Sequence, residues 1–321
     1  MTQKAHGIGL LAAGQTLVWA GIYYVFPAML IHWEDSLNWE RTELTAAFTI
    51  AVLLSALCSP IAGRIIDHGR GASMMCASAA TGGILLIAVS TATDIFQFYI
   101  YWAALGICFS GCLYEPCFAL ITRARGIDAK SSILKVSLIA GFASTLSFPG
   151  VHYLSSTVGW SNTLICFGLV VSLVAAPMLY IGANRAETSA SSINRIASES
   201  TRSYTFLKNP IFWLSGVAFA WIALVHGMTL HHLLPLLREK GVAATTAVAI
   251  ASLIGPMQVI GRILMVSTDQ VVSNHRLMLG CFLALAVSIV ILAASGTQIG
   301  LLVLFVIFFG SAYGMVSVLR P

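Results

Sequence analysis

Two ionisable side chains inside long apolar stretches are the first candidates for chemistry in this sequence. Glu115 is the only acid inside a stretch long enough to cross a membrane, and Arg262 follows Gln258 by one helical turn. A charge at membrane depth costs about 2.5 to 3.5 kcal/mol on insertion scales, so each needs a partner or a function. A buried carboxylate can carry a proton, and a guanidinium can hold an anion through two parallel hydrogen bonds.

Glu115 has two interpretations. It acts as a proton-carrying or gate carboxylate, or it is a structural acid that pairs with Arg123 or with a backbone amide near a helix break at Pro116. In a continuous helix its neighbours on the same face, Gly111 and Cys108 among them, are small. Small residues suit either a cavity or close helix packing.

Arg262 also has two interpretations. Its guanidinium binds an anionic ligand, or it snorkels to the inner membrane interface. Arg64 favours the second, because it has the same Gly-Arg-Ile setting near the end of an earlier apolar stretch.

Polar and aromatic residues at membrane depth extend the candidate site. Gln15 and Trp19 are one helical turn apart and Tyr23 continues near that face. They line a cavity, or they pack between helices with Tyr23 and Tyr24 in the outer aromatic belt.

Three histidines fall in one apolar stretch. His226 lies near its middle and either relays protons or is a core histidine bonded to one carbonyl. His231 and His232 lie nearer the outer end, and we expect both at the interface.

The composition identifies the medium in which these residues act. Of 321 residues, 58% are hydrophobic and 9% are charged, with a mean hydropathy of +0.89. A soluble domain has about a quarter of its residues charged, so this composition excludes a soluble globular enzyme. The net charge of +5 is not gathered into a basic patch, so we expect no nucleic-acid partner.

Cofactor and metal motifs are absent from the sequence. The seven cysteines lie in apolar runs without a CxxC pair, and there is no P-loop, dinucleotide fingerprint, nucleophile elbow or HExxH. We therefore expect no cofactor and no metal. If the protein moves a solute, an ion or solute gradient supplies the energy.

Stretches of about 20 apolar residues, cut where Gly, Pro, Ser and Asn cluster, predict ten membrane-spanning helices. Their predicted limits are residues 8–31, 43–66, 72–92, 96–121, 134–155, 161–182, 211–236, 243–265, 277–294 and 299–319. With a cytoplasmic N-terminus, 14 of the 17 Lys and Arg residues fall on the inner side and 3 on the outer side. This positive-inside bias predicts that both termini are cytoplasmic.

A polar segment divides the spans into six and four. We predict an N-terminal bundle over residues 1–182, a cytoplasmic linker over 183–210 and a C-terminal bundle with four helices over 211–321. Two short matches indicate an internal repeat: Gly63-Arg64-Ile65-Ile66 with Gly261-Arg262-Ile263-Leu264, and Gly111 to Glu115 with Gly310 to Gly314. Their offsets are 198 and 199 residues. Parallel repeats of this kind place a binding site between the halves.

Three motifs resemble the major facilitator superfamily, and more narrowly its bacterial monocarboxylate and oxalate/formate-like branch. They are Asn38-Trp39-Glu40-Arg41-Thr42-Glu43-Leu44, Gly63-Arg64-Ile65-Ile66-Asp67 and Tyr114-Glu115-Pro116-Cys117-Phe118-Ala119. The second departs from the usual signature, with His68 where Arg is usual and Gly69-Arg70-Gly71 one residue early.

The resemblance implies an all-α, two-bundle transporter in a bacterial inner membrane. It implies a substrate carboxylate on Arg262, a gating role for Asp67, and twelve spans in all, so that the second bundle is incomplete and two helices would follow Pro321. With the eleventh span missing, the gating role of Asp67 is open.

The sequence is compatible with two functions. One is a secondary transporter for a small organic solute, such as a monocarboxylate-like anion, driven by proton symport or anion exchange. Its cavity is lined by Gln15, Trp19, Tyr114, His226, Gln258 and Arg262. The other is a truncated, non-transporting bundle that binds another membrane protein. A membrane-embedded enzyme is not expected, because no acid/base or metal cluster lies at one depth.

Overall fold

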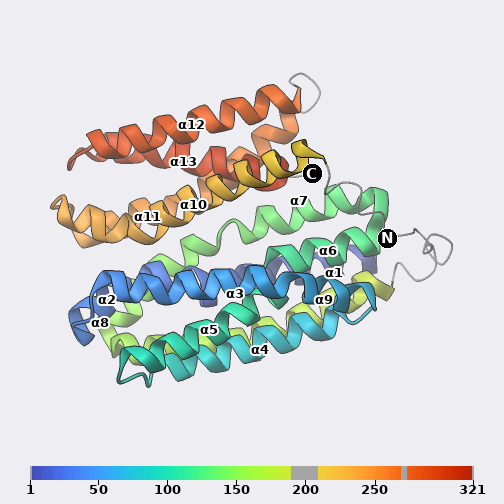
Figure 1. Cartoon of the computed structure of the whole chain (residues 1–321), viewed down its shortest axis with the longest axis horizontal. Coiled ribbons are helices and arrows are strands. Elements are labelled where there is room, and N and C mark those ends of the chain that lie inside the picture. Colours follow the sequence, from blue (N-terminus) through green and yellow to red (C-terminus); the bar gives the residue numbers. More distant parts are fainter. Residues whose placement is uncertain (1, 189–208, 269–272, 320–321) are drawn as a thin grey trace.

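The charge-poor stretches form long helices whose ends fall at polar or glycine-containing turns (Figure 1). The computed structural model describes residues 2–188, 209–268 and 273–319, and the regular secondary structure of these residues is helical. The helices before the central gap are α1 (Thr2–Val18), η1 (Trp19–Tyr23), α2 (Val25–Leu37), α3 (Arg41–Asp67), α4 (Gly71–Val89), α5 (Ile95–Cys112), α6 (Tyr114–Arg125), η2 (Gly126–Asp128), α7 (Ala129–Ala140), α8 (Ala143–Val170), η3 (Val171–Ala175) and α9 (Ala176–Thr188). After the gap come α10 (Pro210–Glu239), α11 (Ala244–Thr268), α12 (Asn274–Ala294) and α13 (Ile299–Leu319).

Nine segments of the described residues are long and apolar enough to cross a membrane, against the ten predicted. The difference lies in the 59-residue segment Ala129–Glu187, which contains the predicted fifth and sixth spans. A straight helix of that length would extend about 90 Å, roughly three times the hydrocarbon thickness. Gly159 interrupts it with φ 83° and ψ 163°, and the chain turns back there. The segment therefore accounts for two crossings, as the sequence predicted.

The helices form two groups that lie side by side in Figure 1, α1 to α9 and α10 to α13. In each group one very close helix contact occupies the same place. A Cβ atom on Gly106 of α5 would overlap the backbone of Ala51 of α3, and a Cβ atom on Gly261 of α11 would overlap the backbone of Ser311 of α13. These pairs are the second and fourth crossings of each group. The same contact in both groups agrees with the internal repeat.

The predicted linker over 183–210 lies mostly outside the described residues. Its first residues belong to α9, which continues to Thr188 instead of ending at residue 182. One ion pair lies at this end of the first group, between Arg123 Nη1 of α6 and Glu187 Oε1 of α9 at 3.5 Å.

The two groups are joined by ion pairs at the end of the molecule opposite the N-terminus. Arg41 of α3 pairs with Glu34 at 2.5 Å and with Glu239 of α10 at 2.6 Å. Arg238 of α10 pairs with Asp35 of α2 at 3.0 Å. Both links cross from one group to the other, so this end is closed.

A layer of rings lies beneath these ion pairs. His231 of α10 is buried against Phe48 at a centroid distance of 4.1 Å, with Phe26 at 5.6 Å and Tyr23 at 5.9 Å. The expectation that His231 is interfacial is therefore wrong. Its ring fills the contact between α10 and the first group.

The close approach of α11 to α13 yields a stability prediction. Gly261→Ala is expected to destabilise the protein by about 1 to 3 kcal/mol, because its Cβ has no room beside Ser311. The measurement is the thermal unfolding midpoint of the purified protein in detergent. Gly280→Ala is the matched control, since a Cβ on Gly280 meets no atom within 4 Å. Equal midpoints for the two variants would contradict this account of the packing.

Candidate functional site

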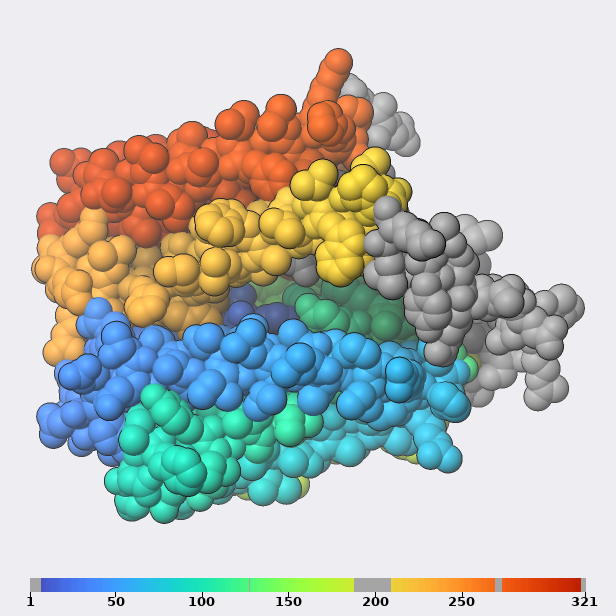
Figure 2. Space-filling view, in the orientation of Figure 1, coloured from blue at the N-terminus to red at the C-terminus, as the bar shows by residue number. Residues whose placement is uncertain are grey.

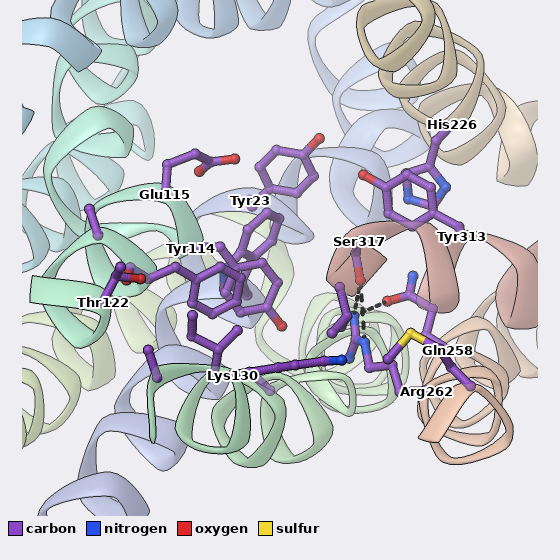
Figure 3. A pocket seen from close by; sticks show the side chains of 18 of the residues that line it. Tyr23, Tyr114, Glu115, Thr122, Lys130, His226, Gln258, Arg262, Tyr313 and Ser317 are labelled. Atoms are coloured by element: carbon purple, nitrogen blue, oxygen red, sulfur yellow. Dashed lines mark hydrogen bonds between the residues drawn. The ribbon is translucent and has the colours of Figure 1, made fainter. Parts of the chain in front are cut away.

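A cavity of about 600 Å³ lies between the two helix groups. It extends to the end of the molecule where α7 and α12 begin, and Figure 2 shows the surface hollowed between the groups. Its principal lining residues are Trp19, Tyr23, Tyr24, Tyr114, Glu115, Phe118, Thr122, Lys130, His226, Gln258, Arg262, Met265, Asn274, Tyr313 and Ser317 (Figure 3).

A π-helical turn brings three aromatic residues to this cavity. In η1 the backbone N–H of Tyr24 donates to the carbonyl of Trp19 at 2.9 Å, five residues back instead of four. The wider turn rotates the chain, and Trp19, Tyr23 and Tyr24 all line the cavity. Single π turns are common at functional sites. The alternative that placed Tyr23 and Tyr24 in an outer aromatic belt is therefore wrong.

A break between two helices brings Tyr114 and Glu115 to the cavity. The predicted span over 96–121 is not continuous, because Leu113 has an extended backbone (φ −79°, ψ −161°) between α5 and α6. Pro116 lies in the first turn of α6, where its missing N–H is tolerated. The face of small residues expected along one continuous helix below Glu115 therefore does not form.

Gln15 stabilises this break. Its side chain is fully buried, and its Nε2 donates to the Cys112 carbonyl at 2.8 Å and the Leu113 carbonyl at 3.4 Å. The Cys112 carbonyl lacks a helical donor because Pro116 has no N–H, whereas the Leu113 carbonyl also accepts from the Cys117 N–H at 3.3 Å. Gln15 does not line the cavity, contrary to the sequence expectation, and instead holds the segment that does.

Glu115 is an exposed side chain at the cavity wall, in the first turn of α6. The positive end of a helix dipole stabilises a carboxylate at this position. The alternative pairing with Arg123 is not formed, since Arg123 pairs with Glu187. Glu115 is thus an acid that faces the cavity.

Arg262 is 1% exposed, which contradicts the snorkelling interpretation. Its guanidinium links α11 to two other helices. Nη1 donates to the Ser137 carbonyl of α7, and Nη2 donates to Ser317 Oγ of α13 at 3.2 Å. Nη2 also donates to Gln258 Oε1 of α11 itself at 3.3 Å. Gly141 leaves the room for this, because a Cβ there would lie 2.7 Å from Nη1. Within residues 2–188, 209–268 and 273–319, no carboxylate forms an ion pair with Arg262.

Further hydrogen-bond donors belong to residues that line the same cavity. Among the described residues, the buried Trp19 Nε1 and Gln258 Nε2 have no acceptor. Lys130 of α7 also lines the cavity, and its side chain extends toward Arg262 in Figure 3. Two cations, Arg262 and Lys130, line the described part of the cavity against one carboxylate, Glu115, and this excess of positive charge favours a ligand that carries negative charge.

Rings complete the walls. Tyr114 lies 4.5 Å from Trp19 and 4.9 Å from Phe118, measured between ring centroids. On the other side, His226 is stacked on Tyr313 at 3.3 Å with an interplanar angle of 2°. His226 is thus a buried ring of the cavity wall.

Six of the eight residues singled out in the sequence meet at this cavity: Trp19, Tyr114, Glu115, His226, Gln258 and Arg262. Gln15 does not reach it, and Asp67 is an exposed residue at the end of α3 that is not part of the lining. Arg64, the repeat counterpart of Arg262, is also exposed. The two repeat positions therefore differ in environment.

Sequence reasoning missed Tyr24, Lys130, Tyr313 and Ser317 as lining residues. A signal existed for Tyr313, because the match at offset 199 aligns it with Tyr114. Lys130 and Ser317 had none, since their position depends on how α7 and α13 pack against α11, and Tyr24 reaches the cavity through the π turn.

The sequence profile of the Major Facilitator Superfamily matches residues 11–320. The chain belongs to this superfamily. It is an integral membrane protein of a transporter fold, and its partners are the bilayer and a small solute. No curated protein sequence matches it at a significant level.

Solved transporter structures share this fold. A bacterial homologue of the human lysosomal transporter Spinster, in an inward-facing and occupied conformation, matches with a TM-score of 0.65 and 14% identity over 99% of this chain and 77% of its own. The same protein in an inward-facing and unoccupied conformation matches with a TM-score of 0.58 and 15% identity, over 98% of this chain and 75% of its own. At such identity the likeness concerns the fold alone.

The hydrogen bonds of Gln15 lead to a prediction about this transporter's site. Gln15→Leu is expected to destabilise the protein by about 1 to 3 kcal/mol, because the Cys112 and Leu113 carbonyls lose a buried donor. Thermal unfolding measures the loss, and hydrogen exchange should show faster exchange at the α5–α6 break. Gln298→Leu, at an exposed position, is the control. Unchanged exchange at the break would show that Gln15 does not brace it.

Proposed function

We propose that the protein is a secondary active transporter that moves a small organic anion across the membrane by alternating access. The observation that carries this proposal is the buried charge of Arg262, which lies between the two helix groups and has only neutral partners among the described residues. A buried charge without a counter-charge is costly. A bound anion would supply that counter-charge.

The chemistry of the neighbours supports a carboxylate. Trp19 Nε1 and Gln258 Nε2 can donate to carboxylate oxygens, and a guanidinium binds a carboxylate in a planar, two-bonded geometry. The motif resemblance to the monocarboxylate and oxalate/formate-like branch points to the same class. A monocarboxylate-like anion is therefore our proposed substrate.

The closed and open ends support alternating access. Ion pairs of Arg41 and Arg238 close one end, while the cavity extends to the other end past Lys130 and Asn274. With the cytoplasmic N-terminus that the positive charges favour, this conformation faces inward. We place the protein in a bacterial inner membrane with both termini in the cytoplasm.

Proton coupling is the proposed role of Glu115. Among the described lining residues Glu115 is the acidic one, and it lies on the wall opposite Arg262 in Figure 3. Asp67 lies outside the lining, so a role in gating would require another conformation. The energy source is then a proton gradient or exchange against a second anion.

Uptake of labelled carboxylates such as formate, acetate and oxalate into proteoliposomes tests the anion site. Arg262→Ala is expected to weaken substrate binding by at least about 30-fold, because truncating a buried charge pair costs roughly 2 kcal/mol or more. Arg276→Ala removes an exposed arginine outside the cavity and serves as the matched control.

Uptake that is equal in the two variants would overturn the anion site. A well-folded protein that binds and transports no carboxylate would instead favour the alternative, a non-transporting bundle that acts as a partner of another membrane protein.

Replacement of Glu115 tests the coupling. Glu115→Gln removes the titrating group, so an imposed pH gradient should no longer stimulate uptake, while exchange of substrate across the membrane continues. Asp67→Asn is compared in the same assay and should keep the response to pH. If Glu115→Gln keeps that response in full, Glu115 is a structural acid of the α6 helix start.

A further inference from the structure

Flat rings line the cavity on both sides of Arg262. The first-group wall consists of Trp19, Tyr114 and Phe118, and the second-group wall consists of His226 and Tyr313. Figure 3 shows Tyr114 of the first wall and both rings of the second. Tyr114 and Tyr313 occupy equivalent repeat positions, so the two walls face the ligand space from corresponding places in the two halves.

The first-group wall is a row of contacting rings. The Tyr114 ring contacts two others, with centroid distances of 4.5 Å to Trp19 and 4.9 Å to Phe118. The rings of Tyr114 and Phe118 are nearly parallel, with an interplanar angle of 15°. Trp19 also contacts Tyr23 at 4.7 Å. Rings held by other rings keep their orientation, and so this wall is preorganised for stacking.

The second-group wall is held in the same way. Tyr313 is stacked on His226, and His226 is stacked on Phe309 at 5.0 Å with an interplanar angle of 14°. His226 is 4% exposed and Phe309 is fully buried. These two packed rings therefore fix the orientation of the Tyr313 ring. The wall therefore presents a ring of fixed orientation to a ligand.

A very small carboxylate would use little of this site. Formate or acetate can reach Arg262, but either fills only a small part of a cavity of about 600 Å³ and leaves both walls uncovered. An organic cation could also lie against rings, but Arg262 and Lys130 in the same cavity disfavour positive charge. The combination of cation and ring walls suits an anion with a flat apolar body.

We propose that the preferred substrate is a planar, conjugated carboxylate whose flat body lies between the two ring walls while its carboxylate binds Arg262. This inference rests on the proposed anion transport and specifies its substrate class. Offset stacking and edge-to-face contacts with Tyr114 and Tyr313 add to the free energy that burial of the body provides.

Benzoate and cyclohexanecarboxylate are the probes that test this. Both carry one carboxylate on a six-membered ring and are ionised at pH 7, but only benzoate is flat. The saturated ring is the more hydrophobic, so burial of apolar area alone predicts that cyclohexanecarboxylate binds at least as tightly. Stacking predicts that benzoate binds about tenfold more tightly in equilibrium binding to the purified protein.

Substitutions of the two tyrosines test whether the ring walls cause the preference for benzoate over cyclohexanecarboxylate. Tyr313→Leu should lower the benzoate preference to about one, and Tyr313→Phe should restore it, because the ring matters and the hydroxyl does not. Tyr114→Leu gives an independent test from the other wall if the Tyr313 variant does not fold. Tyr153→Leu removes a tyrosine that is 68% exposed and should leave the preference unchanged.

The outcomes separate this inference from the proposed function. If both probes bind equally and both require Arg262, the anion site stands and the planar preference is overturned. If benzoate is preferred but the preference survives in both leucine variants, the ring walls do not cause it and the inference is overturned. If neither probe nor any small carboxylate binds a folded protein, both proposals fail.

Discussion

The buried guanidinium of Arg262 is the constraint on which the rest of the site depends. It bonds to α7 through Ser137 and to α13 through Ser317, so one charge ties the second group of helices to the first. Such a buried guanidinium needs hydrogen-bond acceptors nearby and space for its planar group between the helices. Gly141 provides the space, and the carbonyl of Ser137 and the amide of Gln258 provide acceptors. Arg262 and Gln258 lie at the wall of a cavity large enough for a small ligand.

Local departures from regular helix geometry place the side chains around that charge. The π turn at Trp19–Tyr23 and the break at Leu113 each change the direction in which the next residues point. The break also leaves the Cys112 carbonyl without a helical donor. Gln15 satisfies the carbonyls at the break, so a fully buried amide in one helix determines where Tyr114 and Glu115 lie in another.

The contacts that close one end of the molecule are of a different kind from those that hold each group together. Arg41 and Glu239 are partly exposed, as are Arg238 and Asp35, and exposed ion pairs contribute only about 0 to 1 kcal/mol each. The glycine contacts between α3 and α5 and between α11 and α13 bring backbones together and cannot loosen without loss of packing. Weak contacts at this one end are compatible with its opening, while Arg262 and the close approach of Gly255 to the Gly141 carbonyl hold the two groups together elsewhere.

Most of the architecture follows from the sequence because the bilayer restricts the choice of structure. Spans of about 20 apolar residues must form helices, so composition and length predicted the helices and their ten crossings. The repeat match placed Tyr313 beside Tyr114 in the alignment, and periodicity placed Gln258 and Arg262 on one face. Only the tertiary structure decided that Arg262 is buried while Arg64 is exposed, that Gln15 braces a helix break, and that His231 packs between the groups. These outcomes depend on which helices pack against each residue. The sequence of the residue's own helix does not determine those neighbours.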